Sequence, residues 1–170
     1  MKPPLLHIVF PALLLSLLLN VGCKNDTDVN ADTPSDNDGG DTSEDSDWIT
    51  DFDKAKEIAE QENKLILMDF TGSDWCHYCV KFNEEVLSKE EFKTYAKENL
   101  VLVKVDFPRN KEQSDALKKA NAALQEKYQV NGYPTYVVLN SGGEEIGRQE
   151  GYSTGGPKAF TAKIRSYTKK

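Results

Sequence analysis

The sequence predicts an α/β fold in which a central mixed sheet of about four strands is flanked by helices. Short apolar runs typical of buried strands alternate with longer segments of helical periodicity. The resulting order over residues 48–170 is α-β-α-α-β-α-β-β-α. Alternating strands and helices favour parallel pairing, and the two consecutive strands near the end predict an antiparallel edge.

Four elements are expected before residue 98. Residues 51–62 place apolar side chains at helical spacing, and residues 64–70 (KLILMDF) form a short apolar run typical of a buried strand. A helix from about residue 76 to 87 follows a short loop. Ser88 begins the sequence S-K-E-E, the pattern of a capping box, which predicts a second helix through about Lys97.

The remaining elements complete the sheet. Residues 100–106 (LVLVKVD) predict a strand, and a stretch rich in Ala, Lys, Gln and Glu over residues 111–128 predicts a helix. Strands over residues 135–139 and 144–150 flank the turn sequence N-S-G-G and predict a hairpin. Pro157 follows two glycines and suits the first position of a helix, so we expect a terminal helix there.

The N-terminus has the pattern of an export signal. About 15 apolar positions over residues 5–19 follow Lys2. This length is short of the roughly 18–20 residues that span a bilayer and is typical of a signal peptide. Gly22-Cys23 comes soon after, an arrangement that resembles a bacterial lipoprotein signal. The resemblance implies that residues 1–22 are removed and that Cys23 carries a lipid anchor. An ordinary secreted protein with Cys23 as a free thiol is the alternative.

Residues 23–47 differ in composition from the rest of the chain. Nine acids lie between Lys24 and Asp47, without any aromatic residue. Such a segment cannot bury enough apolar surface to offset the entropy of ordering it. We therefore expect an acidic, disordered tether between the lipid anchor and a folded domain over residues 48–170. Calcium binding is the alternative, but the D-x-D-x-D-G loop typical of it is not present.

The charge balance restricts the possible partners. The chain has 28 acids, 21 bases and a net charge of -7. Nine of the 28 acids lie in the tether, and two of the 21 bases, Lys2 and Lys24, also precede residue 48. Residues 48–170 therefore contain 19 acids and 19 bases and have no formal net charge. A nucleic-acid-binding protein needs a basic surface. We therefore expect no nucleic-acid partner, and we expect a monomer.

The sequence Cys76-His77-Tyr78-Cys79 is the strongest indication of function. Cysteines at i and i+3 on a first helical turn lie close enough to form a disulfide. Backbone N–H groups at the helix start favour a thiolate at Cys76, the expected nucleophile, and Cys79 is placed to resolve the mixed disulfide. His77 is either a solvated polar residue or, when protonated, stabilises the Cys76 thiolate. The negative charge of Asp74, an exposed acid of the preceding loop, would instead oppose formation of this thiolate. Tyr78 adds an aromatic surface beside the pair.

Residues 50–170 resemble the thioredoxin family. The matching sequences are Asp69-Phe70, Trp75-Cys76-His77-Tyr78-Cys79, Tyr133-Pro134-Thr135 and Gly142-Gly143. Within the family, the chain is similar to the C-terminal domain of membrane-spanning thiol–disulfide interchange proteins and to related small lipoproteins. The resemblance implies a thioredoxin fold and a thiol–disulfide oxidoreductase without a bound cofactor.

The same resemblance implies roles for four further residues. Asp69 is expected to be a buried carboxylate that takes a proton from the resolving thiol. Trp75, Tyr133 and Pro134 are expected to bind the substrate polypeptide, with Pro134 in the cis conformation and facing the two sulfurs. Without the resemblance, Trp75 could be a core residue and Pro134 an ordinary turn proline.

Two other classes of function use part of this pattern. C-x-x-C also begins zinc and iron–sulfur sites, but residues 48–170 contain no further cysteine and no histidine besides His77. A closed metal site would therefore lack ligands. Covalent haem attachment needs a histidine where Val80 stands. A thioredoxin-like lipoprotein that only binds a partner is the second alternative, and the presence of both cysteines and Pro134 counts against it.

We therefore predict a disulfide oxidoreductase that is anchored to a membrane of a bacterial cell envelope, in the periplasm or at the outer surface. Its expected substrates are protein thiols and disulfides, and reduction would require a membrane-bound electron donor. The cysteine pairs of a reductase, an isomerase and an oxidase differ by roughly tens of millivolts in reduction potential, where about 30 mV corresponds to roughly 1.4 kcal/mol. We expect a reductase.

Overall fold

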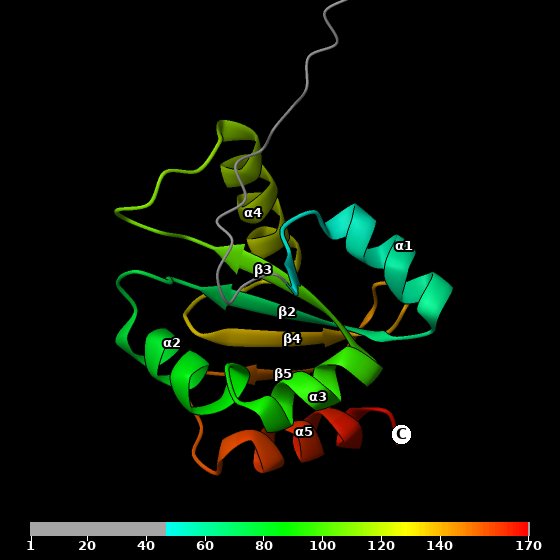
Figure 1. Ribbon diagram of the computed structural model, residues 1–170. Coiled ribbons are helices and arrows are strands. Elements are labelled where there is room, and N and C mark those ends of the chain that lie inside the picture. Colours follow the sequence, from blue (N-terminus) through cyan, green and yellow to red (C-terminus); the bar gives the residue numbers. More distant parts are fainter. Residues whose placement is uncertain (1–46, 170) are drawn as a thin grey trace, which may run out of the picture. The chain divides into compact units, whose positions relative to one another are not determined.

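The structure is a computed structural model that describes residues 47–169. It confirms an α/β fold in which helices cover both faces of a mixed sheet (Figure 1). The elements in chain order are β1 (Trp48–Ile49), α1 (Phe52–Glu62), β2 (Leu65–Thr71), α2 (His77–Phe82), the π-helical η1 (Asn83–Leu87), α3 (Glu90–Asn99), β3 (Leu100–Asp106), α4 (Asp115–Lys127), β4 (Thr135–Leu139), β5 (Glu145–Glu150) and α5 (Gly156–Tyr167).

The N-terminal predictions lie almost wholly outside the described residues. The expected signal peptide over residues 1–22, the lipid anchor at Cys23 and all of the acidic tether but Asp47 belong to this part of the chain. Among the helices that the structure describes, none has the length and apolar character needed to cross a membrane.

The sheet has the order β1-β3-β2-β4-β5. β1, β3 and β2 are parallel, β4 is antiparallel to β2, and β5 is antiparallel to β4. The predicted combination of parallel pairing with an antiparallel hairpin is thus confirmed. The strand number differs from the expected four, because Trp48 and Ile49 pair with Leu102 and Val103 and add a fifth strand. Two residues are too few to produce a strand pattern in a sequence.

Side chains of the central strands alternate between two cores. In β2, Ile66, Met68 and Phe70 pack with buried residues of α1 and α4. Leu67 packs on the other face with residues of α2, α3 and α5. Figure 1 shows the same division, with α1 and α4 on one side of the sheet and α2, α3 and α5 on the other. Burial of β2 on both faces explains why its sequence is apolar except for Asp69 and the terminal Thr71.

Two helix boundaries differ from the prediction near residue 88. The single helix expected over residues 76–87 ends its α-helical part at Phe82 and continues as the π-helical η1. The prediction of a capping box at Ser88 is wrong, because the N-cap residue of α3 is Lys89, which makes no side-chain hydrogen bond there. The Ser88 hydroxyl instead donates to the carbonyl oxygen of Glu84, at 3.1 Å, because the preceding helical turn lies closer to it.

The helix expected over residues 111–128 begins later than predicted. α4 starts at Asp115, after Ser114, whose hydroxyl accepts a hydrogen bond from the Leu117 N–H at 3.2 Å. This is ordinary N-capping. The residues before Ser114 form an irregular connection, and the Phe107 N–H at its start donates to the Thr71 carbonyl at the end of β2, at 2.9 Å. Tertiary contacts therefore compete with local helix propensity where this segment begins.

Candidate active site

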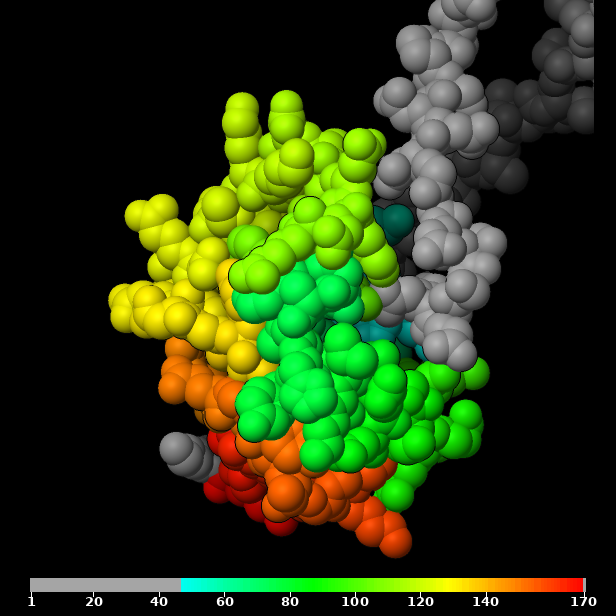
Figure 2. Space-filling view, turned by 90° about the vertical axis from the view of Figure 1, so that its left-hand side faces the viewer, coloured from blue at the N-terminus to red at the C-terminus, as the bar shows by residue number. Residues whose placement is uncertain are grey.

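The two cysteines lie at the edge of the sheet where β2 and β3 end and β4 begins. Figure 2 shows this face, on which the green segment after β2 and the yellow-green segment after β3 lie side by side. Cys76 and Cys79 form a disulfide with their Cα atoms 5.2 Å apart, as the spacing predicts. Cys76 is 8% exposed and Cys79 is 3% exposed. Both cysteines are therefore largely shielded from solvent in the oxidised protein, Cys79 more than Cys76.

Cys76 occupies the N-cap of α2. It therefore comes one residue before the helix that was expected to begin with it. Its Sγ accepts a hydrogen bond from the Cys79 backbone N–H, at 3.3 Å. In the reduced protein a thiolate at the same position would accept this N–H, and charged acceptors make the stronger hydrogen bonds. The geometry thus favours Cys76 as the sulfur that carries negative charge.

Asp69 is buried in β2, with 5% of its surface exposed. Strand register places it opposite Lys104 of β3 on one side and Tyr136 of β4 on the other. Burial raises the pKa of the Tyr136 hydroxyl well above its ordinary value, and the negative charge of Asp69 adds to this rise. The predicted burial of Asp69 is confirmed, whereas its role as a proton acceptor remains a prediction.

Trp75 lies at the surface beside the pair, with 37% of its surface exposed. Its indole Nε1 donates to the carbonyl oxygen of Phe107 at 2.8 Å, and its ring meets Tyr133 edge to face at 6.0 Å. The indole also covers Gly72, where a Cβ atom would lie 2.5 Å from the ring. A glycine at this position therefore lets the indole lie close to the backbone. The exposure of Trp75 contradicts the alternative of a core residue, whereas its role in substrate binding remains a prediction.

The peptide bond between Tyr133 and Pro134 is cis, which confirms this prediction. The Pro134 carbonyl accepts a hydrogen bond from the Gly151 N–H at 2.8 Å, so the end of β5 holds the start of β4. Tyr133 stacks on Phe107 with ring centroids 5.2 Å apart. The orientation of Pro134 toward the two sulfurs remains a prediction.

His77 and Tyr78 lie on the other flank of the pair. Tyr78 is 56% exposed, and its ring lies 5.4 Å from His77 and 5.8 Å from Tyr152. The Tyr152 hydroxyl donates to Glu85 at 2.5 Å, which holds that ring beside the helix. No local sequence pattern connects Tyr152 with the cysteines, because it follows β5 far along the chain, and it was not among the predicted site residues.

Asp74 has a structural role that the sequence did not reveal. Its carboxylate accepts hydrogen bonds from the backbone N–H groups of Arg109 at 2.9 Å, Asn110 at 2.6 Å and Lys111 at 3.2 Å. These bonds, led by the one from Arg109, hold the pKa of Asp74 below its ordinary value, against a smaller opposing effect of desolvation. Asp74 therefore joins the segment after β2 to the segment after β3. The donors lie 35 to 37 residues away, beyond the reach of sequence patterns.

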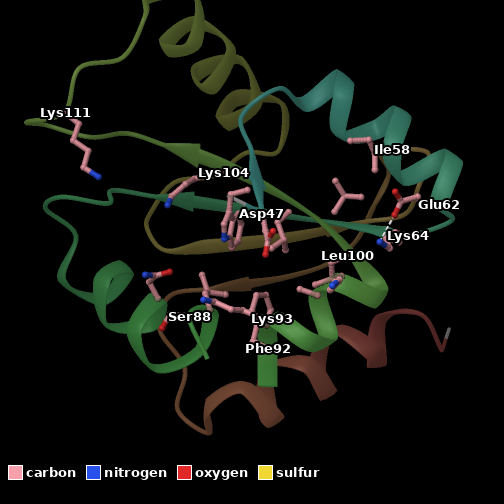
Figure 3. A pocket seen from close by; sticks show the side chains of 17 residues that line it. Asp47, Ile58, Glu62, Lys64, Ser88, Phe92, Lys93, Leu100, Lys104 and Lys111 are labelled. Carbon is pink, nitrogen blue, oxygen red and sulfur yellow. Dashed lines mark ion pairs between the residues drawn. The ribbon is translucent and has the colours of Figure 1, made fainter. Parts of the chain in front are cut away.

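A separate cavity of about 520 Å³ lies beside α3, β1 and β3 (Figure 3). Neither cysteine lines it. Its charged lining consists of five lysines and two acids: Lys64, Lys93, Lys97, Lys104, Lys111, Asp47 and Glu62. Within residues 47–169, no cluster of three or more His, Cys, Asp or Glu side chains could hold a metal ion.

Comparisons with known proteins agree with this geometry. A thioredoxin-like domain family matches residues 52–168. The disulfide bond reductase DsbH of Chlamydia pneumoniae is 36% identical over 118 residues, which cover 69% of this chain and 70% of that protein. The thiol:disulfide interchange protein DsbD of Campylobacter jejuni is 31% identical over 101 residues, 59% of this chain but only 16% of that protein.

The solved structures include a close counterpart of the fold. The DsbH oxidoreductase superimposes with a TM-score of 0.68 at 35% identity, covering 72% of this chain and 83% of that one. The region that the family matches, residues 52–168, contains strands β2 to β5, the cysteine pair and the cis proline described above. The chain therefore belongs to the thioredoxin-like family.

Proposed function

We propose that this thiol–disulfide oxidoreductase acts as a reductase of protein disulfides outside the cytoplasm. The single observation that carries the proposal is the Cys76–Cys79 disulfide at the surface edge of a thioredoxin-like domain. The similarity to a protein named a disulfide bond reductase supports the direction of electron transfer. The exposed aromatic rings of Trp75 and Tyr78 on either side of the pair offer contacts to a polypeptide substrate.

The first step is nucleophilic attack on the substrate. The Cys76 thiolate attacks one sulfur of the substrate disulfide, so that a bond forms between Cys76 and the substrate while the substrate's S–S bond breaks. The other substrate sulfur leaves as a thiolate and takes a proton. The Cys79 N–H, which lies 3.3 Å from the Cys76 sulfur, stabilises the charge on the attacking sulfur before this step.

The second step releases the substrate. Cys79 loses its proton, for which buried Asp69 is the proposed acceptor, and its thiolate attacks the Cys76 sulfur. The bond between Cys76 and the substrate breaks, the second substrate thiolate leaves, and the Cys76–Cys79 disulfide forms. Two electrons have passed to the substrate, so a donor dithiol must return two electrons and two protons. We assign this donor to a membrane-bound protein, consistent with the similarity to DsbD.

The reduction potential of the Cys76–Cys79 pair tests the proposed direction. We expect a value near the roughly -270 mV of thioredoxin, because a reductase must hold its electrons less tightly than its substrates do. Equilibration of the protein with glutathione buffers of known ratio measures this quantity. A value near the roughly -120 mV of a strong oxidant would contradict the reductase proposal and indicate an oxidase.

We also propose that the protein is held at a membrane of the cell envelope through Cys23. The support is the apolar stretch over residues 5–19 followed by Gly22 and Cys23, together with the acidic composition of residues 24–47. A tether of this length would let the folded domain reach substrates at some distance from the bilayer, since charged linkers repel themselves and extend.

Replacing Cys23 by serine tests the anchor. We expect Cys23→Ser to move the protein from the membrane fraction to the soluble fraction, because the thiol that would carry the lipid is lost. Fractionation of cells followed by detection of the protein measures the change. Cys79→Ser is the matched control and should remain in the membrane fraction. Equal partitioning of Cys23→Ser and the unaltered protein would contradict the proposed anchor.

A further inference from the structure

The segment after β3 forms part of the same surface as the cysteine pair. The Ser73 N–H and hydroxyl donate to the Asp106 carboxylate at 2.9 and 2.5 Å. The Phe107 N–H donates to the Thr71 carbonyl at 2.9 Å, and the Trp75 indole donates to the Phe107 carbonyl at 2.8 Å. Figure 2 shows the two segments in contact on the face that carries the site. Residues 107–111 are therefore fixed against the active-site loop.

Asp74 strengthens this connection at its outer end. Its carboxylate accepts three successive backbone N–H groups, those of Arg109, Asn110 and Lys111. The carboxylate is charged at neutral pH, and these bonds lower the pKa of Asp74 further, so the three donors make charge-assisted hydrogen bonds. The Asp74 carboxylate is thus already hydrogen-bonded to backbone donors of the segment after β3.

Arg109 is the side chain that this connection positions. Its guanidinium lies over the Trp75 ring, 4.0 Å from the ring centroid, in a cation–π arrangement. Trp75 in turn contacts Tyr133, the residue before the cis proline. Arg109 is exposed to solvent, and within the part of the chain that the structure describes it forms no ion pair with a carboxylate. A cation with available N–H donors therefore lies at the edge of the substrate-binding surface.

The two acids that join the active-site loop to the segment after β3 already have partners. Asp74 accepts backbone N–H groups, and Asp106 accepts the Ser73 N–H and hydroxyl. An arginine can stack on an indole and still present its N–H edge to a carboxylate, whereas a lysine offers a point charge without the planar surface. Neither of these two acids forms an ion pair with Arg109 in the part of the chain that the structure describes, so its guanidinium edge can receive a carboxylate of a bound polypeptide.

We infer that Arg109, positioned over Trp75 by Asp74, selects protein disulfides that have acidic residues next to the reactive cysteine. This inference rests on the proposed reductase function and names its substrate class. Arg109 is the specificity-determining residue, and Asp74 is a positioning residue that acts through the backbone of residues 109–111. The chemistry of reduction at Cys76 is unchanged; the ion pair contributes to substrate binding.

The test compares two peptide disulfides that differ only in the residues flanking the cysteine, Asp in one and Asn in the other. The kcat/KM for reduction of each is measured with dithiothreitol as electron donor, and the Asp/Asn ratio is compared between variants. We expect the ratio to fall about two- to fivefold in Arg109→Gln, the effect of losing one exposed ion pair, and to fall less in Arg109→Lys. Added salt should reduce the difference between the unaltered protein and Arg109→Gln.

Lys97→Gln is the matched control for loss of one positive charge. Lys97 is exposed in the last turn of α3, next to the start of β3, whereas the site lies at the other end of that strand. This variant should keep the ratio of the unaltered protein. If Arg109→Gln keeps that ratio as well, or if Lys97→Gln lowers it equally, the inference about Arg109 is overturned.

Asp74→Asn distinguishes positioning from simple charge. Removing a negative charge near the site would by itself raise the Asp/Asn ratio, because an acidic peptide would be repelled less. Loss of the bonds to residues 109–111 should instead lower the ratio, since Arg109 is no longer held over Trp75. A raised ratio would overturn the role of Asp74. If the unaltered protein reduces neither peptide, the proposed reductase function itself fails. If the unaltered protein reduces both peptides, but with the same Asp/Asn ratio of kcat/KM as Arg109→Gln, only the proposed specificity is overturned.

Discussion

Cys76→Ser should abolish the reduction of protein disulfides, the largest change in activity expected from one substitution. A serine hydroxyl does not ionise near neutral pH, so the nucleophile is lost although the shape of the site is kept. Cys79 cannot replace it, because only 3% of its surface is exposed. The rate of insulin disulfide reduction in the presence of dithiothreitol, corrected for the uncatalysed rate, measures the loss.

Cys79→Ala should have a different consequence. The first step can still occur, but no thiolate remains to release the substrate, so mixed disulfides between Cys76 and substrates should accumulate. Non-reducing electrophoresis of envelope extracts detects these species, and the double variant that also lacks Cys76 should form none. Cys23→Ser provides the control for loss of a thiol as such and should retain full activity in solution. Turnover by Cys76→Ser at the rate of the unaltered protein would disprove the proposed mechanism.

Phe82→Ala should cause the largest loss of stability among the residues close to the site. Phe82 is fully buried in α2, and its ring packs 4.5 Å from Tyr136 and 5.1 Å from Phe160. Truncating a buried phenylalanine removes this contact area and leaves a cavity, which costs about 3–5 kcal/mol of the free energy of unfolding. Urea denaturation of the oxidised protein measures the change.

Val80→Ala is the matched control for this prediction. Val80 belongs to the same helix, but 39% of its surface is exposed and it is not part of either core. Its truncation should change the free energy of unfolding by about 0.5 kcal/mol or less. Equal effects of the two substitutions would mean that α2 is not anchored to the sheet through Phe82.

The sequence predicted those features of the site that depend on short spacing. The disulfide between Cys76 and Cys79 follows from their separation of three residues, and the structure confirms it. The cis bond before Pro134 and the burial of Asp69 were implied by resemblance to the thioredoxin family, and both are confirmed. These features are determined by one strand, one turn or one helix start, so they leave a local pattern.

The sequence did not predict features that join distant segments. Asp74 was interpreted as an exposed acid, yet its carboxylate binds the backbone of residues 109–111. Backbone donors carry no side-chain signature, so nothing in the sequence marks Arg109 or its neighbours as partners of Asp74. The late start of α4 at Asp115 has a related cause, because the preceding residues are held against the end of β2.

The α/β class, the order of the predicted elements and the identity of the redox pair follow from the amino-acid sequence alone, because periodicity and the C-x-x-C spacing are local properties of the chain. The pairing of β1 with β3, the contact of Tyr152 with Tyr78 and the position of Arg109 over Trp75 are visible only in the folded protein. These contacts join residues separated by tens of positions. Those of Tyr152 and Arg109 form because the ends of β2, β3 and β5 meet at one edge of the sheet.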